Sequence, residues 1–179
     1  MKTFKRIIKY LTDKKMTIST MESCTGGGVA NAITCVEGAS DVIKFAAVTY
    51  SNEYKIKMGV SKDIIDKYSV YSMETAKEMA RVIANYTNST IGIGITGKLN
   101  RADSSNHFGK DNEVFISIFY DNMYYDNSII VDKSTRRQNK QVIIDFIINR
   151  LEEILWKEKS IESNYLSITI TNPERLLAN

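Results

Sequence analysis

A serine followed by a glycine-rich turn stands near the start of the chain, in the run Glu-Ser-Cys-Thr-Gly-Gly-Gly at positions 22–28. Apolar spacing predicts a strand before this run and a helix after it, so Ser23 lies where a strand ends and a helix begins. Free backbone N–H groups collect at such a junction and favour an anion or an oxyanion. The spacing matches neither the phosphate loop, nor the dinucleotide fingerprint, nor G-x-S-x-G. The motif alone therefore fits a serine nucleophile or a glycine-eased turn without chemistry.

A serine nucleophile needs a group that accepts its proton. The single histidine, His107, stands in a polar stretch without a hydrophobic anchor, which favours a surface position over a catalytic one. A lysine is the better candidate, because burial lowers its pKa and leaves a neutral fraction. Lys55 follows the apolar strand 45–50, and strand carboxyl ends in an α/β sheet converge on one crevice. The sequence therefore predicts that Ser23 and Lys55 meet.

The two cysteines point to neither a zinc site nor a disulfide framework. Cys24 and Cys35 form no C-x-x-C motif and lack the further ligands that a zinc site needs, so we expect no metal. Cys24 is a stronger nucleophile than a serine in its thiolate form, but on a strand-turn its side chain points away from that of Ser23. We expect Cys24 to be a small buried hydrophobe and the protein to reside in a reducing cytoplasm.

The elements that must position these residues alternate between helix and strand, which is typical of an α/β fold. A cap at Ser72 begins the strongest early helix, and Asp121-Asn122 is typical of a hairpin turn. Helices are predicted near residues 3–14, 26–35, 53–58, 62–68, 72–83 and 142–155, and strands near 16–21, 43–50, 91–95, 114–119 and 128–131.

Composition narrows the class of protein further. With 179 residues and 43% apolar content, the chain suits a single compact domain. The net charge of +3 is small beside 24 basic and 21 acidic residues spread along the chain, so we expect no nucleic-acid partner. No segment is long and apolar enough to cross a membrane or to act as a secretory signal core, so we expect no membrane partner and a cytoplasmic location.

Five motifs follow one another along the chain: Glu22-Ser23-Cys24-Thr25-Gly26-Gly27, Gly38-Ala39-Ser40, Tyr50-Ser51-Asn52-x-x-Lys55, Gly59-Val60 and Val70-x-Ser72-x-x-x-Ala76-x-x-Met79-Ala80. In this order they resemble the C-terminal domain of the CinA (competence/damage-inducible) family, and the resemblance runs from the first helix to about residue 156. That family includes nicotinamide-nucleotide amidases, which convert nicotinamide mononucleotide to nicotinic acid mononucleotide and ammonia by a Ser/Lys mechanism. We expect a single-domain, three-layer α/β/α sandwich with a mixed sheet over residues 1–157.

The resemblance implies roles for individual residues. Ser23 becomes the nucleophile, Lys55 the general base and Tyr50 a supporting hydroxyl. Backbone N–H groups around Thr25 to Gly27, helped by the positive helix start, receive the oxyanion. Arg136 seats the substrate phosphate, although a solvated helix start is an alternative for it. The implied substrate-binding set is Thr25, Gly26, Gly27, Asn52, Thr96, Gly97 and Arg136. Glu22 orients its neighbours or is purely structural. The resemblance implies no cofactor. It implies a homodimer or higher homo-oligomer.

The chain departs from the family in the loop after the strand 91–95. The family usually continues Thr-Gly-x-Ala-Gly-Pro, whereas this chain keeps Thr96-Gly97 and then reads Lys-Leu-Asn-Arg-Ala-Asp. Three hypotheses follow: a stand-alone amidase for nicotinamide mononucleotide, a Ser/Lys hydrolase of another small amide, and a nucleotide-binding or regulatory module without turnover. The tail 158–179 has no family counterpart, and alternation over 166–170 predicts an added edge strand there.

Overall fold

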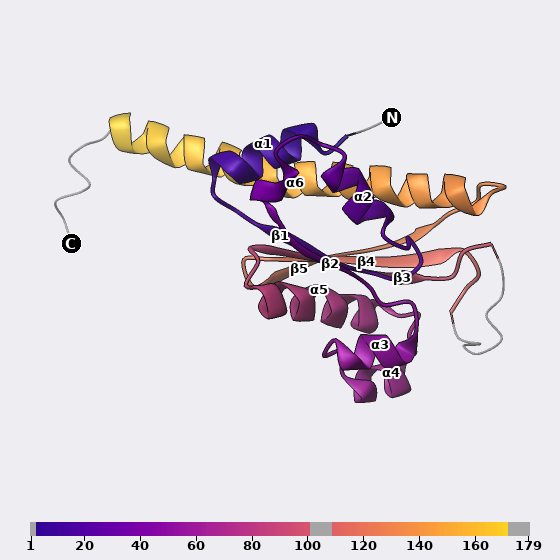
Figure 1. Ribbon diagram of the computed structural model, residues 1–179. Helices are drawn as coiled ribbons and strands as arrows, with labels where there is room; N and C mark the ends of the chain where they lie inside the picture. The colour runs from indigo at the N-terminus through magenta and orange to yellow at the C-terminus, as the bar shows by residue number, and fades with distance from the viewer. Residues whose placement is uncertain (1–2, 101–108, 172–179) are drawn as a thin grey trace.

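The computed structural model describes the backbone of residues 3–100 and 109–171, and side chains in these ranges up to residue 156. Helix and strand alternate as predicted (Figure 1). The helices are α1 (Lys5–Asp13), α2 (Gly28–Thr34), α3 (Asn52–Lys57), α4 (Lys62–Tyr68), α5 (Met73–Thr87) and α6 (Arg136–Thr171), with a short 3-10 helix at Ala39–Asp41; the strands are β1 (Ile18–Glu22), β2 (Ile43–Val48), β3 (Ile91–Gly97), β4 (Glu113–Tyr120) and β5 (Met123–Ile130).

The strands form one mixed sheet in the order β2-β1-β3-β4-β5. Strands β2, β1 and β3 run parallel, and β4 and β5 are antiparallel to their neighbours. Helices α1, α2 and α6 cover one face of the sheet, while α5, with α3 and α4 beside it, covers the other (Figure 1). This confirms the predicted three-layer α/β/α sandwich, in which β1, followed directly by Ser23, is an interior strand between β2 and β3.

The sheet is buried on both faces because two apolar clusters sandwich it. The larger cluster joins the sheet to α1, α2 and α6, and includes Phe4, Leu11, Ile33, Ile147 and Leu151. The smaller one joins the sheet to α5 and the α3–α4 segment. Every residue of β1 is buried, so the strand that carries the serine is fixed from both sides.

Helix α5 lies unusually close to β3. Its buried stripe of Ala76, Met79, Ala80 and Ile83 is the one that the sequence predicts, and the Ser72 hydroxyl accepts the N–H of Thr75 as the predicted cap. A Cβ atom added to Gly94 would stand 2.1 Å from the carbonyl oxygen of Ala76, inside its van der Waals surface. The absence of a side chain at this strand position is therefore what lets the helix backbone approach.

The predicted edge strand over residues 166–170 is wrong, because α6 continues as helix through Thr171. A helix that has already formed adds each further residue for one more hydrogen bond, whereas a new strand would have to pay the entropy of a turn first. Extending α6 is therefore the easier continuation for the tail.

Replacing Gly94 with Ala should lower the free energy of unfolding by at least ~2 kcal/mol, because the new methyl group forces α5 away from β3. Gly38→Ala is the matched control. Gly38 has a φ of +81° and open space around its Cβ position, so only backbone strain of about 1 kcal/mol is expected. Urea unfolding of both variants measures the difference, and equal losses would contradict the close approach of α5.

Candidate active site

Ser23 lies in a tight turn between β1 and α2. Its N–H donates to the carbonyl of Ile95 at 3.0 Å, which ties it to β3, and its own carbonyl accepts the N–H of Gly26 at 3.0 Å. Gly26 and Gly27 have φ values of +63° and +86°, a left-handed conformation that side chains disfavour. The glycines therefore let the chain reverse directly after the serine, whose side chain is only 7% exposed.

Lys55 reaches Ser23 from helix α3. The Ser51 hydroxyl caps α3 by accepting the N–H of Tyr54, and the last turn of α3 directs Lys55 inward. The Lys55 side chain is 1% exposed, and its Nζ donates to Ser23 Oγ at 3.2 Å and to the Thr49 carbonyl at 2.6 Å. The two residues that the sequence pairs across 32 positions are thus in hydrogen-bond contact.

Burial changes the chemistry of the Lys55 amine. Desolvation is the larger cause and lowers its pKa from 10.5 to about 8, while Cys24 acts in the opposite direction. With a pKa near 8, about a tenth of the amine is neutral at pH 7, against about one part in three thousand for an ordinary lysine. The position can therefore accept a proton from Ser23 near neutral pH.

The carboxylate of Glu22 accepts hydrogen bonds from backbone N–H groups in the first turn of α2. Glu22 is fully buried and accepts the N–H groups of Val29 at 3.1 Å and Ala30 at 2.8 Å. The expectation that the helix start lends positive potential to an oxyanion therefore needs correction, since this carboxylate offsets it. Within the described residues, the N–H groups of Thr25 and Gly27 have no protein acceptor, so the turn itself holds the available donors.

Cys24 has the structural role that the sequence predicts. Its side chain is 2% exposed and belongs to the apolar cluster beneath α2 and α6. Burial raises the pKa of its thiol to about 12, so the reactive thiolate is not formed near neutral pH. Ser23 is thus the available nucleophile of this turn.

Arg136 bridges the two strand ends that flank Ser23. As the first residue of α6, it donates to the Tyr50 hydroxyl at 2.8 Å and to the carbonyl of Leu99. Tyr50 follows β2, and Leu99 follows β3, so the bridge crosses the end of the intervening strand β1. The structure joins Tyr50 to Arg136, and the hydrogen bonds described for Ser23 and Lys55 do not include its hydroxyl.

The remaining predicted substrate-binding residues occupy the same strand ends. Thr96 is buried and donates its hydroxyl to the Val70 carbonyl at 2.8 Å, and Gly97 packs against β4. Asn52 opens α3, beside the Ser51 cap. Their contact with a substrate stays a prediction, as does that of Thr25, Gly26 and Gly27. His107 lies outside the described residues.

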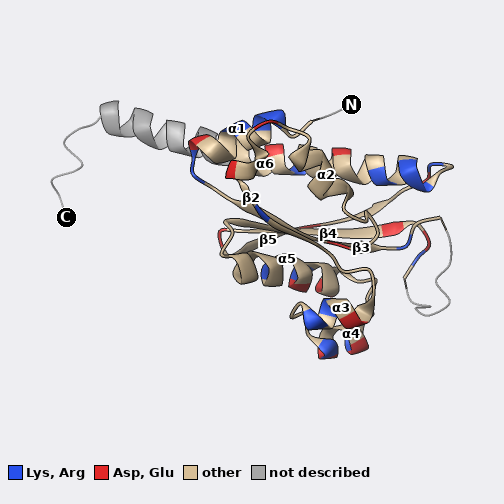
Figure 2. Ribbon diagram, in the orientation of Figure 1, with Lys and Arg blue, Asp and Glu red and all other residues tan. Residues whose placement is uncertain are grey.

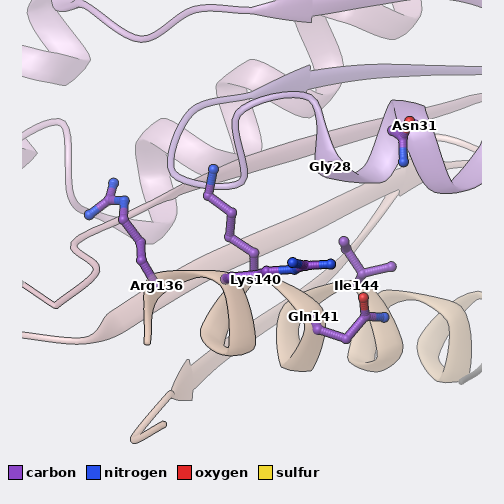
Figure 3. Close-up of a pocket in the computed structure, with 7 residues that line it drawn as sticks. Gly28, Asn31, Arg136, Lys140, Gln141 and Ile144 are labelled. Atoms are coloured by element: carbon purple, nitrogen blue, oxygen red, sulfur yellow. The ribbon is translucent and has the colours of Figure 1, made fainter. Parts of the chain in front are cut away.

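A cavity of about 350 Å³ opens between α2 and the start of α6, beside the serine turn. Lys and Arg positions, blue on the ribbon, cluster at this end of α6 (Figure 2). Lys140 extends from α6 towards the turn that precedes α2 (Figure 3), and a Cβ on Gly26 would stand 3.0 Å from its Nζ. The cavity is lined by Gly28, Asn31, Arg136, Arg137, Lys140, Gln141 and Ile144.

Sequence reasoning missed the contribution of Lys140. The available signal is its spacing, since Arg136, Lys140 and Ile144 recur every four residues and so share one face of α6. That face could be assigned to the site only once α6 was known to cross the serine turn.

The described residues offer no metal centre. They contain no group of three or more His, Cys, Asp or Glu side chains placed to hold an ion.

None of the helices in the described ranges has the length and apolar character that crossing a bilayer demands.

Comparison with known proteins finds relatives from one family. The sequence profile of the CinA C-terminal domain matches residues 1–155. A CinA-like protein of Flavobacterium psychrophilum is 36% identical over 160 residues, which cover 88% of this chain and 36% of that protein. The chain thus spans about a third of the length of this relative.

Solved structures share the fold. A CinA superfamily protein of Klebsiella pneumoniae superposes with a TM-score of 0.79 at 20% identity, covering 86% of this chain and 95% of its own. The competence/damage inducible protein CihA of Agrobacterium tumefaciens gives a TM-score of 0.72 at 25% identity, covering 84% and 90% of the two chains. The three-layer sandwich is therefore the architecture of these proteins as well.

Labelling of Ser23 by a fluorophosphonate should report the Lys55 base without any assumed substrate. Because the neutral amine is the reactive form, the rate should rise about tenfold from pH 6 to pH 7 and level off above pH 8. Lys55→Met should slow labelling at least ~100-fold, and Ser23→Ala should abolish it. Lys57→Met, two residues further along the same helix, is the matched control, and a pH-independent wild-type rate would contradict the assignment.

Proposed function

We propose that this chain, which belongs to the CinA C-terminal domain family, is an amidohydrolase that converts nicotinamide mononucleotide to nicotinic acid mononucleotide and ammonia. The observation that carries the proposal is the hydrogen bond between the buried Lys55 amine and Ser23 Oγ, together with the lowered pKa of that amine. A nucleophile and a base in contact at the end of a central strand are what a serine amidase requires.

The proposed reaction proceeds through an acyl-enzyme. Neutral Lys55 takes the Ser23 proton as Oγ attacks the carboxamide carbon, and the N–H groups of Thr25 and Gly27 receive the oxyanion. Collapse of the tetrahedral adduct breaks the C–N bond, and the Lys55 ammonium returns its proton to the leaving nitrogen, which departs as ammonia. Lys55 then deprotonates a water that attacks the ester, and the acid is released with Ser23 restored. The scheme uses no metal or cofactor.

Substrate recognition in this proposal involves the bridge between Tyr50 and Arg136. The guanidinium keeps donors beyond the two that bind the Tyr50 hydroxyl and the Leu99 carbonyl, and it borders the basic cavity. Arg136 would seat the phosphate, while Tyr50 supports the nicotinamide end of the site. The enzyme would act on a cytoplasmic nucleotide.

A second candidate is a Ser/Lys hydrolase of another small amide, and the loop after β3 favours it. Leu99 stands where the family loop begins to differ, and Arg136 donates to its carbonyl. Lys98, at the variable position directly before it, is buried, donates to the Gly109 carbonyl at 3.3 Å and lies over the Tyr71 ring. The loop of this chain therefore has anchors that a family loop of Ala, Gly and Pro does not predict. The same difference in the loop is consistent with the third hypothesis, a nucleotide-binding module that does not hydrolyse its ligand.

Purified wild-type protein should release ammonia from nicotinamide mononucleotide without added metal. Ser23→Ala should reduce the rate to background, and Lys55→Ala should reduce it at least ~100-fold, because each removes one partner of the proton transfer. Ser61→Ala and Lys57→Ala are matched controls on neighbouring segments and should retain activity.

Failure of this assay has distinct meanings. Wild type that binds the mononucleotide without releasing ammonia would replace the amidase with a binding module. Wild type that releases ammonia only from other small amides would keep the Ser/Lys hydrolase and change its substrate. Full activity in Lys55→Ala would overturn the proposed base.

A homodimer is the proposed assembly, and the edge strand β2 is its proposed interface. Within the part of the chain that the structure describes, β2 pairs along one edge, with β1, and its Phe45 and Val48 side chains are 40% and 52% exposed. An unpaired edge with apolar side chains favours pairing with a second strand. Sedimentation velocity should give twice the chain mass for wild type and the monomer mass for Phe45→Lys. A monomeric wild type would contradict the dimer.

A further inference from the structure

Asn139, in the first turn of α6, is fully buried although its side chain is polar. Its Nδ2 donates to Asn100 Oδ1 at 2.8 Å and to the Lys133 carbonyl at 3.2 Å. Its Oδ1 accepts the N–H of Lys133 at 2.8 Å, so both donors of the amide and its acceptor oxygen are used. A buried amide with these hydrogen bonds fixes the groups around it, because a displacement would leave a polar group unpaired.

Asn100 extends these hydrogen bonds into the loop that follows β3. Its Nδ2 donates to the Lys133 carbonyl at 3.2 Å, and its backbone N–H donates to Asn112 Oδ1 at 2.6 Å. Asn100 and Asn112 have φ values of +59° and +60°, a left-handed conformation that asparagine tolerates better than most residues. Asn100 stands at the second glycine of the pattern Thr-Gly-x-Ala-Gly-Pro, and it adds side-chain hydrogen bonds that a glycine lacks.

The peptide unit between Leu99 and Asn100 connects this network to Arg136. The Leu99 carbonyl accepts a hydrogen bond from Arg136, which also donates to the Tyr50 hydroxyl. The N–H at the other end of the same peptide unit is the one that Asn112 holds. Because a peptide unit is planar, fixing its N–H also fixes the direction of its carbonyl. A loop that lost these asparagine contacts would therefore release the Arg136 guanidinium.

We infer that Asn139 and Asn100 are positioning residues, which hold the loop after β3 so that the Leu99 carbonyl keeps Arg136 in its bridge to Tyr50. Within the described residues, neither asparagine is hydrogen-bonded to Ser23 or Lys55, so an effect on the reaction passes through Arg136. The effect on turnover rests on the proposed function, whereas the fixed loop can be measured without a substrate.

Hydrogen–deuterium exchange followed by NMR tests the network directly. Asn139→Ala should speed exchange of the Lys133 and Asn100 amides at least ~10-fold, because the first loses its acceptor and the second loses its anchor to α6. Ser117→Ala is the matched control, since Ser117 is also fully buried and loses a hydrogen bond to Asp126 in the middle of β4. The control should leave both loop amides unchanged. Equal exchange of these amides in Asn139→Ala and wild type would overturn the network.

Asn100→Gly tests the same network without creating a buried cavity, because the Asn100 side chain is exposed. Glycine keeps the positive φ and removes only the side-chain hydrogen bonds. The amide at position 100 should exchange at least ~10-fold faster than in wild type. An unchanged rate would show that the asparagine side chain does not hold the loop, and would overturn the inference even if Asn139→Ala fails to fold.

Turnover of nicotinamide mononucleotide tests the connection to Arg136. Asn139→Ala and Asn100→Gly should each raise KM at least ~5-fold, while fluorophosphonate labelling of Ser23 stays within about twofold of wild type, because proton transfer to Lys55 does not use Arg136. In an Arg136→Gln background, Asn139→Ala should lower kcat/KM by less than about twofold, since the residue through which it acts is already lost. Independent losses that multiply would overturn the positioning role.

The two kinds of readout separate this inference from the proposed function. If wild type does not hydrolyse nicotinamide mononucleotide, the proposed function fails, and amide exchange still decides whether the asparagines hold the loop. If wild type is active and Asn139→Ala has the wild-type KM, the positioning role fails and the proposed function stands.

Discussion

The arrangement of the site depends on a buried lysine that pairs with no carboxylate among the described residues. Lys55 keeps its amine next to Ser23 because the Thr49 carbonyl accepts one of its hydrogen bonds and the Ser51 cap fixes the helix that carries it. Because the Lys55 pKa is lower in the folded state than in the unfolded state, burial of the charged amine reduces the free energy of unfolding. This loss of stability is complete below pH 8. It shrinks between pH 8 and pH 10.5, where the folded form has lost the proton and the unfolded form still holds it. A shift from 10.5 to about 8 corresponds to about 3 kcal/mol at most. The same desolvation that lowers stability makes the amine a base near neutral pH.

Sequence reasoning succeeded where local chemistry and sheet topology determine the outcome. Ser23 and Lys55 meet because both follow strands that are neighbours in the parallel part of the sheet, and strand ends converge. The Ser72 cap and the left-handed Asp121 and Asn122 of the β4–β5 turn are likewise encoded by residues adjacent in the chain. These features need no knowledge of how distant layers pack.

The features that sequence reasoning missed arise from packing between layers. Nothing near Glu22 in the sequence reveals that its carboxylate caps α2, because the contact requires the turn to fold the helix back over β1. Lys140 becomes part of the site only because α6 crosses above the serine turn. The strand predicted over residues 166–170 was wrong for a different reason. Alternating apolar residues fit a strand, but continuing helix α6 is a lower-cost conformation for the same residues.

In the proposed site, the base and the phosphate-binding cations come from opposite faces of the sheet. Lys55 approaches from the layer of α3 and α5, whereas Arg136 and Lys140 approach from the layer of α2 and α6 (Figure 1). A phosphate bound next to Lys55 would stabilise its ammonium form and raise its pKa, which would remove the neutral base. A phosphate held among the α6 cations would interact less with Lys55 than one in contact with it, because Coulomb energy falls with distance. The separation of base and cations between two layers thus allows one site to bind a charged substrate and still deprotonate a serine.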